Sequence, residues 1–281
     1  MGLSQNTRNL IRAALREDAP RGDITSRYFG SRKTPARAKI IAKASGVLCG
    51  LEAAQYCFTS VSRRTVFQAR QTDGARIQKG ETLATVQGRL NDLLLAERTA
   101  LNLLQHLSGI ATETRKMTGL LRGSRARLLD TRKTTPGLRE LEKYAVAAGG
   151  GQNHRLNLSA MVLIKDNHLT GLSLPELRKR IIYFKRRHKK APLEIEAASL
   201  SQVKNFLRLP VDIILLDNMP LSGIRKAVKL RGQLNPACRL EISGGVNART
   251  LPTLAKTGVD YISCGRITHS APALDISLLI Q

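Results

Sequence analysis

The chain has 281 residues, 42% of them apolar, which is enough for one large α/β domain or for a barrel with a smaller domain. Its 46 basic residues outnumber its 21 acidic ones, and the resulting formal charge of +25 attracts anions in general. This composition excludes a disordered chain, and no apolar stretch is long enough to span a bilayer.

The first 110 residues combine helices with short strands. The pattern predicts, in chain order, a helix over 1–18, strands over 36–43, 66–70 and 81–86, and a long helix over 91–107. Hairpin turns are expected at 72–74 and 79–80, and Gly109 is expected to interrupt the long helix. These elements predict an α+β unit.

After residue 110 the chain alternates between apolar strands and helical patterns. Short apolar runs occur at 127–129, 161–164, 193–195, 211–216, 240–242 and 261–263. Helical patterns such as 221–229 and 248–257 separate them. Repeated βα units at this spacing predict a parallel sheet or an α/β barrel.

The run DTRKTTPG at 130–137 directly follows the first of these strands. Arg132 and Lys133 bring two cations, and the threonines bring hydroxyl groups. Thr135 can cap a helix and Pro136 suits a first helical turn, so a helix is predicted to begin here. Cations and hydroxyls at the start of a helix suit a polyanion.

Polar residues stand at or just after the carboxyl end of each predicted strand. They are Asp130 with Arg132 and Lys133, then Lys165 to His168, Glu196, Asp217 with Asn218, Ser243 to Gly245, and Gly265. One such residue alone would be read as a solvated loop residue. Six sets in register are typical of the mouth of a barrel, where catalytic groups collect.

These residue types favour an anionic ligand. The candidate donors to phosphate or carboxylate are Arg132, Lys133, His154, Arg155 and Lys165. The runs Gly149-Gly150-Gly151 and Ser243-Gly244-Gly245 allow close approach of backbone N–H groups, although a loop or a helix C-cap also explains the first run. Glu196 and Asp217 can accept from sugar hydroxyls or hold Mg²⁺, or simply pair with neighbouring cations. No P-loop, GxGxxG or HExxH motif is present, so a Rossmann domain or a zinc hydrolase is not supported.

The densest basic cluster, at 185–190, follows an amphipathic helical pattern over 174–184. It is interpreted as a solvated helix face and end, on the opposite side of the barrel from the mouth. Aromatic residues form only 4% of the chain and Trp is absent, so a base-stacking surface is poorly supplied. Nucleic-acid binding is therefore not expected, although the charge of +25 does not exclude it.

The four cysteines include no CxxC pair and stand among apolar or small residues. Reduced thiols in a cytoplasmic protein, without disulfides or zinc, are the expectation.

Taken in order, the motifs resemble those of the quinolinate phosphoribosyltransferase family, which are type II phosphoribosyltransferases. The matching segments are DTRKTTPG at 130–137, GGGQNHR at 149–155, LIKDNH at 163–168, LLDN at 215–218, SGGV at 243–246 and THS at 268–270. N-terminal elements at 17–25, 96–99 and 107–111 resemble the family as well, so the likeness covers nearly the whole chain.

The resemblance implies an incomplete α/β barrel of seven strands over 111–270 and an N-terminal α/β sandwich over 1–110, which residues 271–281 join. It also implies a reaction in de novo NAD synthesis. Quinolinate and 5-phosphoribosyl 1-pyrophosphate, with Mg²⁺, give nicotinate mononucleotide, pyrophosphate and CO₂.

The resemblance also assigns roles to individual residues. Arg132, His154 and Arg155 would clasp the quinolinate carboxylates, and Lys133 and Lys165 would reach a carboxylate or the phosphates. Arg98 would come from the other subunit, which makes a homodimer the smallest active unit and leaves higher homo-oligomers open. Lys133, Lys165, Glu196 and Asp217 would be catalytic. Glu196 and Asp217 would also face ribose hydroxyls and hold the metal weakly, mainly through substrate. The 5-phosphate would be surrounded by Ser243, Gly244, Gly245, Gly265 and His269.

Two positions depart from the family pattern. Ala198 stands where a third acid alternating with Glu194 and Glu196 is usual, and Arg266 follows Gly265 where a small or apolar residue is usual. Two alternatives stay open. One is a paralogous phosphoribosyltransferase of the molybdenum-transport-associated type with another anionic acceptor, and the other is a basic nucleic-acid-binding protein on the same scaffold.

Overall fold

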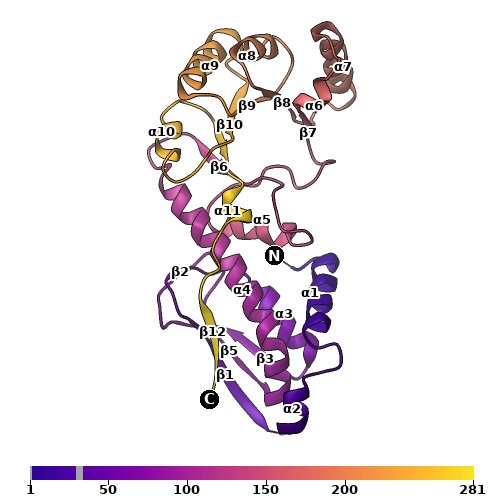
Figure 1. Ribbon diagram of the computed structural model, residues 1–281, viewed down its shortest axis with the longest axis vertical. Helices are drawn as coiled ribbons and strands as arrows, with labels where there is room; N and C mark the ends of the chain where they lie inside the picture. Colours follow the sequence, from indigo (N-terminus) through magenta and orange to yellow (C-terminus); the bar gives the residue numbers. More distant parts are fainter. Residues whose placement is uncertain (1, 30–33) are drawn as a thin grey trace. The chain divides into compact units, whose positions relative to one another are not determined.

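The computed structural model describes residues 2–29 and 34–281, and the chain divides into two compact units (Figure 1). The first unit comprises residues 1–116, 134–150 and 267–281, and the second comprises 117–133 and 151–266. The chain thus leaves the first unit and returns to it twice.

The first unit contains a four-stranded antiparallel sheet in the order β12-β1-β5-β3. Its strands are β1 (Pro35–Ala42), β3 (Val66–Ala69), β5 (Thr82–Arg89) and β12 (Ile276–Ile280). Alternation along β1 buries Ala38, Ile40 and Ala42 on one face, as expected for a sheet covered on one side. The last strand of the chain completes this sheet, because Ile40 pairs with Leu278.

The hairpins expected at 72–74 and 79–80 are not formed, although both segments are turns. Gly74 and Gly80 have φ angles of 88° and 89°, which suit glycine. However, the strand between the turns, β4 (Arg76–Ile77), pairs with β2 (Gly46–Val47), and β3 pairs directly with β5. Local turn chemistry predicted the turns but not which strands they join.

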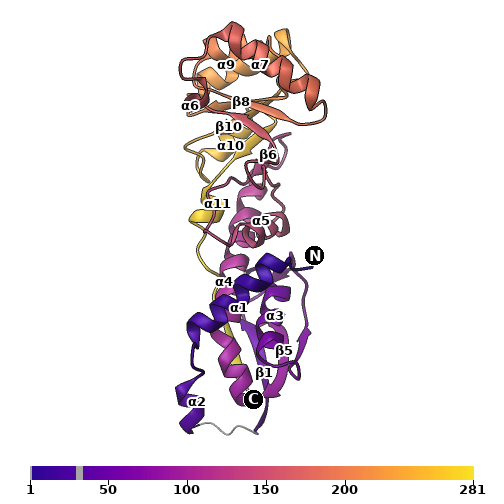
Figure 2. The same ribbon diagram turned by 90° about the vertical axis from the view of Figure 1, so that its right-hand side faces the viewer.

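The helices of the first unit are α1 (Gln5–Asp18), α2 (Ile24–Phe29), α3 (Leu51–Val61), α4 (Leu90–Gly119), α5 (Arg139–Ala148) and α11 (Arg266–His269); the last residues of α4 and the first of α11 belong to the second unit. Helix α3 packs on the sheet through Phe58 and Phe67, whose ring centroids are 6.0 Å apart. Figure 2 shows α1, α3 and α4 beside the strands of this unit.

Two helix predictions were wrong. Gly109 does not interrupt the long helix, because α4 continues to Gly119. A Cβ atom at Gly109 would lie 2.1 Å from the carbonyl oxygen of Pro272, so glycine is there for close packing. Helix α5 begins at Arg139 rather than at Pro136, because residues 136–138 form a turn in which Gly137 has a φ of 84°, outside the helical region.

The second unit contains a parallel sheet of six described strands in the order β6-β11-β10-β9-β8-β7. The strands are β6 (Arg127–Leu129), β7 (Val162–Ile164), β8 (Leu193–Ala197), β9 (Ile213–Asp217), β10 (Arg239–Ser243) and β11 (Tyr261–Ser263). Seven strands were expected. Between β6 and β7 the chain adds only a single parallel bridge between Leu129 and Gln152, because the glycine-rich and polar segment around it does not extend into a strand.

Helices follow most of these strands, as predicted for βα units. They are α6 (Asp166–Leu169), α7 (Leu174–Arg187), α8 (Leu200–Phe206), α9 (Leu221–Leu234) and α10 (Leu251–Ala255). Helix α7 begins at a Ser173 cap and buries Leu177 and Ile181, with its cations at the last turn. Arg180 pairs with Glu176 and Lys185 with Asp212, as expected for a solvated face.

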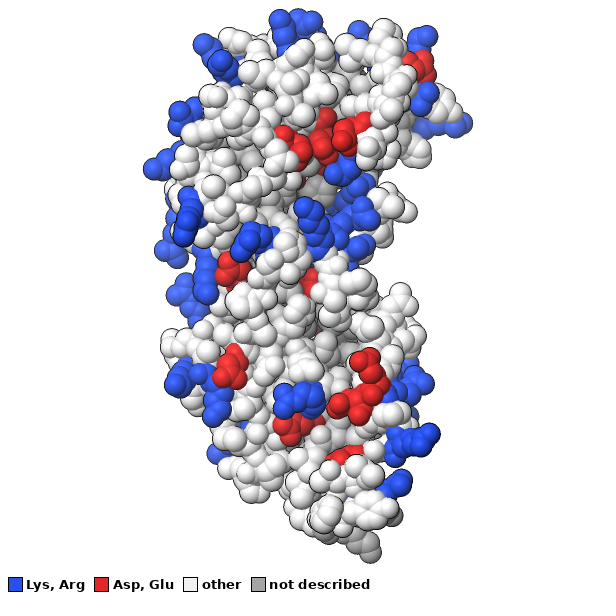
Figure 3. All heavy atoms as spheres, viewed as in Figure 1, with Lys and Arg blue, Asp and Glu red and all other residues white. Residues whose placement is uncertain are grey.

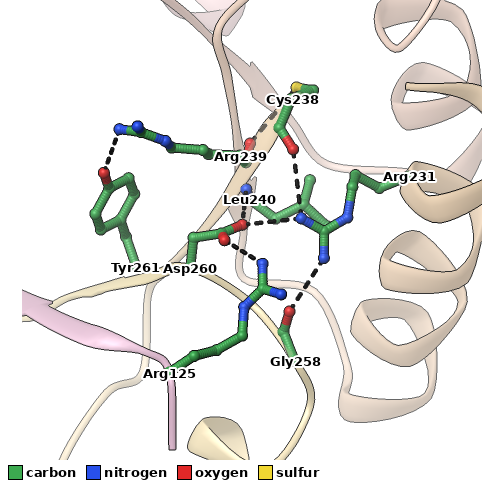
Figure 4. Close-up of polar contacts among 8 residues, drawn as sticks. All are labelled: Arg125, Arg231, Cys238, Arg239, Leu240, Gly258, Asp260 and Tyr261. Atoms are coloured by element: carbon green, nitrogen blue, oxygen red, sulfur yellow. Dashed lines mark hydrogen bonds and ion pairs between the residues drawn. The ribbon is translucent and has the colours of Figure 1, made fainter. Parts of the chain in front are cut away.

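Asp260, which precedes β11, links the amino ends of β6, β10 and β11 in the second unit (Figure 4). Its Oδ2 atom accepts from the Leu240 N–H at 2.9 Å and from Arg231 Nη1 at 3.2 Å, and its other oxygen pairs with Arg125. Arg231 also donates to the Gly258 carbonyl at 3.3 Å. This network lies at the opposite edge of the sheet from the strand ends that carry the candidate site.

All four cysteines are buried thiols. Burial raises the pKa of Cys57 and of Cys238 to about 12, so neither is a reactive thiolate near neutral pH. Across the residues described, no helix has both the length and the apolar character that crossing a membrane requires.

Candidate active site

The carboxyl ends of the six parallel strands lie at one edge of the sheet in the second unit. Residue pairing along the sheet sets Asp217 of β9 beside Ser243 of β10 and Glu196 of β8 beside Leu215 of β9. Asp130 follows β6, Lys165 follows β7 and Gly265 lies just beyond β11. The predicted polar sets therefore share one edge of one sheet, as expected for a barrel mouth.

Glu196 and Lys165 form an ion pair at this edge. Lys165 Nζ lies 3.0 Å from Glu196 Oε2, and the side chains are 46% and 13% exposed. The structure thus contains the pairing with a neighbouring cation that the sequence suggested for Glu196. Asp217 is only partly exposed and accepts from the Asn218 side-chain amide at 3.0 Å. In the space-filling view, acidic side chains lie beside basic ones in the region where Figure 1 places β8 and β9 (Figure 3).

A tight backbone arrangement joins the ends of β9 and β10. Asn218 has a φ of 49°, and its N–H donates to the Ser243 carbonyl at 2.9 Å. Gly244 has a φ of 89°, and a Cβ atom there would lie 2.1 Å from Asn218 Oδ1. Gly245 also has a positive φ, of 61°, and has open space around it. Only glycine fits at position 244, and the open space around Gly245 lets a ligand approach the backbone.

Two guanidinium groups lie close together near the same edge. The pKa of Arg155 is lowered, first by burial and then by the positive charge of Arg132. Arg155 Nη1 also donates to the Met161 carbonyl at 3.1 Å. Two neighbouring cations in a partly buried place favour an anion that can bind both.

His154 precedes this arginine and points into the interior of the unit. Its side chain is 10% exposed, and its Nε2 atom lies 2.9 Å from Glu194 Oε2 and 3.7 Å from Glu241 Oε2. Its backbone N–H donates to Oδ1 of the fully buried Asp130 at 2.8 Å. The histidine is thus held by residues that follow or belong to β6, β8 and β10.

Sequence reasoning missed Glu241 and gave Glu194 no role. Both carboxyls are buried, and burial raises the pKa of Glu194 to about 7 and that of Glu241 to about 8. Glu194 and Glu241 stand two residues before Glu196 and Ser243, so each faces the same side of its strand one step deeper. An acid in the middle of a buried apolar strand, as in Leu240-Glu241-Ile242, was the available signal.

Three other candidate residues are exposed on the protein surface. Lys133 is exposed, and its N–H donates to Thr131 Oγ1 at 3.0 Å. Arg98 is exposed on α4 and His269 is exposed at the end of α11, with its Nδ1 atom 2.7 Å from Ser270 Oγ. Both belong to the first unit, and their roles toward substrate stay predictions. The departing residues Ala198 and Arg266 are both exposed.

Comparison with known proteins identifies the family of this chain. Residues 23–108 match the family model for the N-terminal domain of quinolinate phosphoribosyl transferase, and residues 110–279 match that for its C-terminal domain. The chain belongs to the quinolinate phosphoribosyltransferase family. The fold expected of this family, an N-terminal α/β unit with a parallel α/β unit, is confirmed, apart from the number of barrel strands.

Relatives match over the full length of the chain. The nicotinate-nucleotide pyrophosphorylase [carboxylating] of Mycobacterium leprae is 41% identical, with 96% of each chain covered. The probable enzyme of the same name from Bacillus subtilis is 38% identical, with 96% of this chain and 92% of the relative covered. Among solved structures, the nicotinate-nucleotide pyrophosphorylase of Francisella tularensis is 33% identical with a TM-score of 0.92, covering 100% of this chain and 98% of its own. That of Ehrlichia chaffeensis is 38% identical with a TM-score of 0.91, covering both chains completely.

Proposed function

We propose that this protein transfers a phosphoribosyl group from 5-phosphoribosyl 1-pyrophosphate to quinolinate and decarboxylates the product, giving nicotinate mononucleotide, pyrophosphate and CO₂ in NAD synthesis. The supporting observation is a match to both family domains, with relatives of up to 41% identity over 96% of the chain. These relatives are named for the carboxylating pyrophosphorylase, which favours quinolinate over another anionic acceptor. A cytoplasmic location is part of the proposal and is supported by the buried thiols.

The first step joins the pyridine nitrogen to the anomeric carbon of the ribose while pyrophosphate leaves. The transition state has oxocarbenium character, so nearby anions and a neutralised leaving group lower its energy. Glu196 and Asp217 supply negative charge toward the ribose, and Lys133 and Lys165 neutralise the pyrophosphate. The ion pair of Lys165 with Glu196 holds both groups in place before substrate binds.

The second step removes the carboxylate next to the ring nitrogen. The carbon–carbon bond breaks, CO₂ leaves, and the electron pair stays on the ring carbon beside the cationic nitrogen until a proton from solvent takes the vacated position. Arg132 and Arg155 hold the substrate carboxylates during both steps. No protein nucleophile is required, because the ring itself accepts the electrons.

Magnesium is part of the proposal and would act by neutralising pyrophosphate oxygens. The carboxylates of Glu196 and Asp217 are oxygen ligands of the type that Mg²⁺ prefers, and both are partly exposed. Glu196 already pairs with Lys165, and Ala198 adds no third acid. These residues would therefore hold a magnesium ion only weakly, and most of its ligands would be oxygen atoms of the substrate.

A homodimer in which Arg98 of one subunit serves the site of the other completes the proposal. The exposure of Arg98 on α4 is compatible with this arrangement.

An assay tests the function directly. Purified protein is incubated with quinolinate, phosphoribosyl pyrophosphate and Mg²⁺, and nicotinate mononucleotide and CO₂ are measured. Parallel reactions contain nicotinate or another pyridine acid in place of quinolinate. Product from quinolinate alone supports the proposal, whereas product only from another acceptor would overturn it.

A further inference from the structure

Both ring nitrogens of His154 are engaged inside the protein. The backbone N–H of Arg155 donates to Nδ1 at 2.8 Å, so Nδ1 is an acceptor and carries no proton. Nε2 lies 2.9 Å from Glu194 Oε2 and therefore carries the proton that it donates to this carboxyl group. The ring is thus the neutral Nε2–H tautomer.

From this geometry we infer that His154 is a positioning residue, which orients Arg155 through its backbone N–H and does not itself bind the quinolinate carboxylate. The inference rests on the proposed function for the identity of the substrate and deepens it. The family resemblance assigns a carboxylate contact to this histidine. A ring that is 10% exposed, with its one donor directed at Glu194, has no second donor to offer a substrate.

The segment that carries His154 is fixed to the first strand of the sheet. The Gln152 N–H donates to the Leu128 carbonyl at 2.9 Å, and the Asp130 N–H donates to the Gln152 carbonyl at 3.1 Å. Asp130 returns a third bond by accepting the His154 N–H at 2.8 Å. The backbone just before Arg155 is therefore held by β6 and by Asp130, the residue that follows β6.

The ring then links this segment to strands farther along the sheet. Glu194 belongs to β8 and Glu241 to β10, and β6 is separated from both by other strands. Contact of one imidazole with both acids therefore links the segment that precedes Arg155 to β8 and β10. Displacement of the ring would free the Arg155 N–H and move a guanidinium that is otherwise held by the Met161 carbonyl.

A protonated ring does not fit this arrangement. An imidazolium carries N–H donors on both nitrogens, and the one on Nδ1 would face the N–H of Arg155 at 2.8 Å. The positive charge for the substrate carboxylates therefore comes from Arg132 and Arg155. His154 sets the position of the Arg155 guanidinium.

A double-mutant cycle separates positioning from direct binding. His154→Ala is expected to lower kcat/KM for quinolinate about a hundredfold, the size of effect that a misplaced binding group can have. In an Arg155→Ala background, the same change is expected to have little further effect, because the group that it positions is gone. Multiplicative losses in the double variant would overturn the inference, since two independent substrate contacts would give them.

Two conservative variants keep the test valid if His154→Ala fails to fold. The amide oxygen of His154→Asn can still accept the Arg155 N–H, and the amide nitrogen of His154→Gln can still donate to Glu194. Partial rescue by these uncharged side chains is expected. The matched control is His188→Ala at the end of α7, on the other edge of the sheet, with unchanged kcat/KM expected. If Asn and Gln are as poor as Ala in a folded protein, the inference is wrong.

A measurement without turnover separates this inference from the proposed function. Protein labelled with ¹⁵N-histidine is studied by NMR at pH 7.5, and the His154 signals are identified by their loss in His154→Asn. One protonated and one unprotonated ring nitrogen are expected, before and after addition of quinolinate. Two protonated nitrogens would contradict the inference even if the enzyme assay succeeds, and the expected tautomer would support it even if quinolinate is not the substrate.

Discussion

Burial and then the positive charge of Arg132 lower the pKa of Arg155, and a dianionic substrate bound as proposed would relieve the repulsion between the two arginines. The sequence alone predicted both arginines, Arg132 as a cation directly after a buried strand and Arg155 as one of several candidate anion donors beyond the glycine run at 149–151. It could not predict that His154, between them in the chain, uses both ring nitrogens within the protein. Side-chain direction depends on tertiary contacts with β8 and β10, which the local pattern does not contain.

Arg132→Lys is expected to lower kcat/KM for quinolinate about a hundredfold although the charge is kept. A guanidinium can bind a carboxylate through two parallel hydrogen bonds, and an ammonium cannot. Steady-state kinetics with quinolinate varied at saturating phosphoribosyl pyrophosphate measures the change. Arg127→Lys, at the exposed start of the same strand, is the control and should match the wild type. Equal kcat/KM values for both variants would show that Arg132 does not bind the quinolinate carboxylates.

Glu241→Gln is expected to change how stability depends on pH. Burial raises the pKa of Glu241 from 4.5 to about 8, so the folded state holds a proton that the unfolded state releases between these values. The stabilising effect is complete below pH 4.5 and is lost as the pH rises through about 8. The wild type should therefore lose on the order of 5 kcal/mol of unfolding free energy across this window from this group.

Urea unfolding at several pH values between 5 and 9 measures this difference. The Gln variant should show a shallower decline and exceed the wild type in stability above pH 8, because its side chain is neutral throughout. Parallel curves for the two proteins would show that the Glu241 carboxyl titrates normally.

The individual elements were predictable where their signal is local. Apolar runs with polar residues behind them located all six described strands of the parallel sheet, and with them the edge that carries the candidate site. The signal failed where a distant segment decides the outcome. Gly109 reads as a helix interruption, but the backbone of Pro272 packs against it.

Gly244→Ala tests the tight backbone arrangement at the carboxyl ends of β9 and β10. The new methyl group would collide with the Asn218 side chain at a φ of 89°, so the backbone must shift. A loss of about 1 to 3 kcal/mol in stability is expected, together with a larger KM for phosphoribosyl pyrophosphate. Gly232→Ala is the matched control, because nothing lies within 4 Å of the added atom and α9 should become slightly more stable. An unchanged KM in Gly244→Ala would show that the backbone at Gly244 does not contribute to binding of the phosphate.

Asp260→Asn tests the opposite edge of the same sheet. It leaves Arg231, which is only 10% exposed, without its carboxylate, and a loss of about 3 kcal/mol is expected. Thermal and urea unfolding measure the loss, and kcat at a temperature where the variant is folded should equal that of the wild type. Glu176→Gln, which removes an exposed pair on α7, should change stability by less than about 0.5 kcal/mol. A fall in kcat for folded Asp260→Asn would mean that the two edges are coupled.

For the whole molecule, the proposed exchange of Arg98 between subunits can be tested by mixing inactive variants. Arg98→Ala and Lys165→Ala are each expected to be inactive. When equal amounts are co-refolded, half of the dimers are mixed, and one site in each mixed dimer has both an intact barrel and an intact partner arginine. Activity should recover to about a quarter of the wild-type value. Absence of recovery, with mixed dimers shown by mass spectrometry, would place Arg98 in its own subunit's site or outside any site.

The pairing of β12 with β1 also orders events during synthesis. Strand β1 leaves the ribosome before the second unit is made, but its neighbour on one side, residues 276–280, is made only after that unit. The second unit, whose strands are all encoded between, can form its parallel sheet while the first still has an open sheet edge. An unpaired strand edge invites association with other chains. The nascent chain is therefore exposed to aggregation through β1 in the interval before β12 is released.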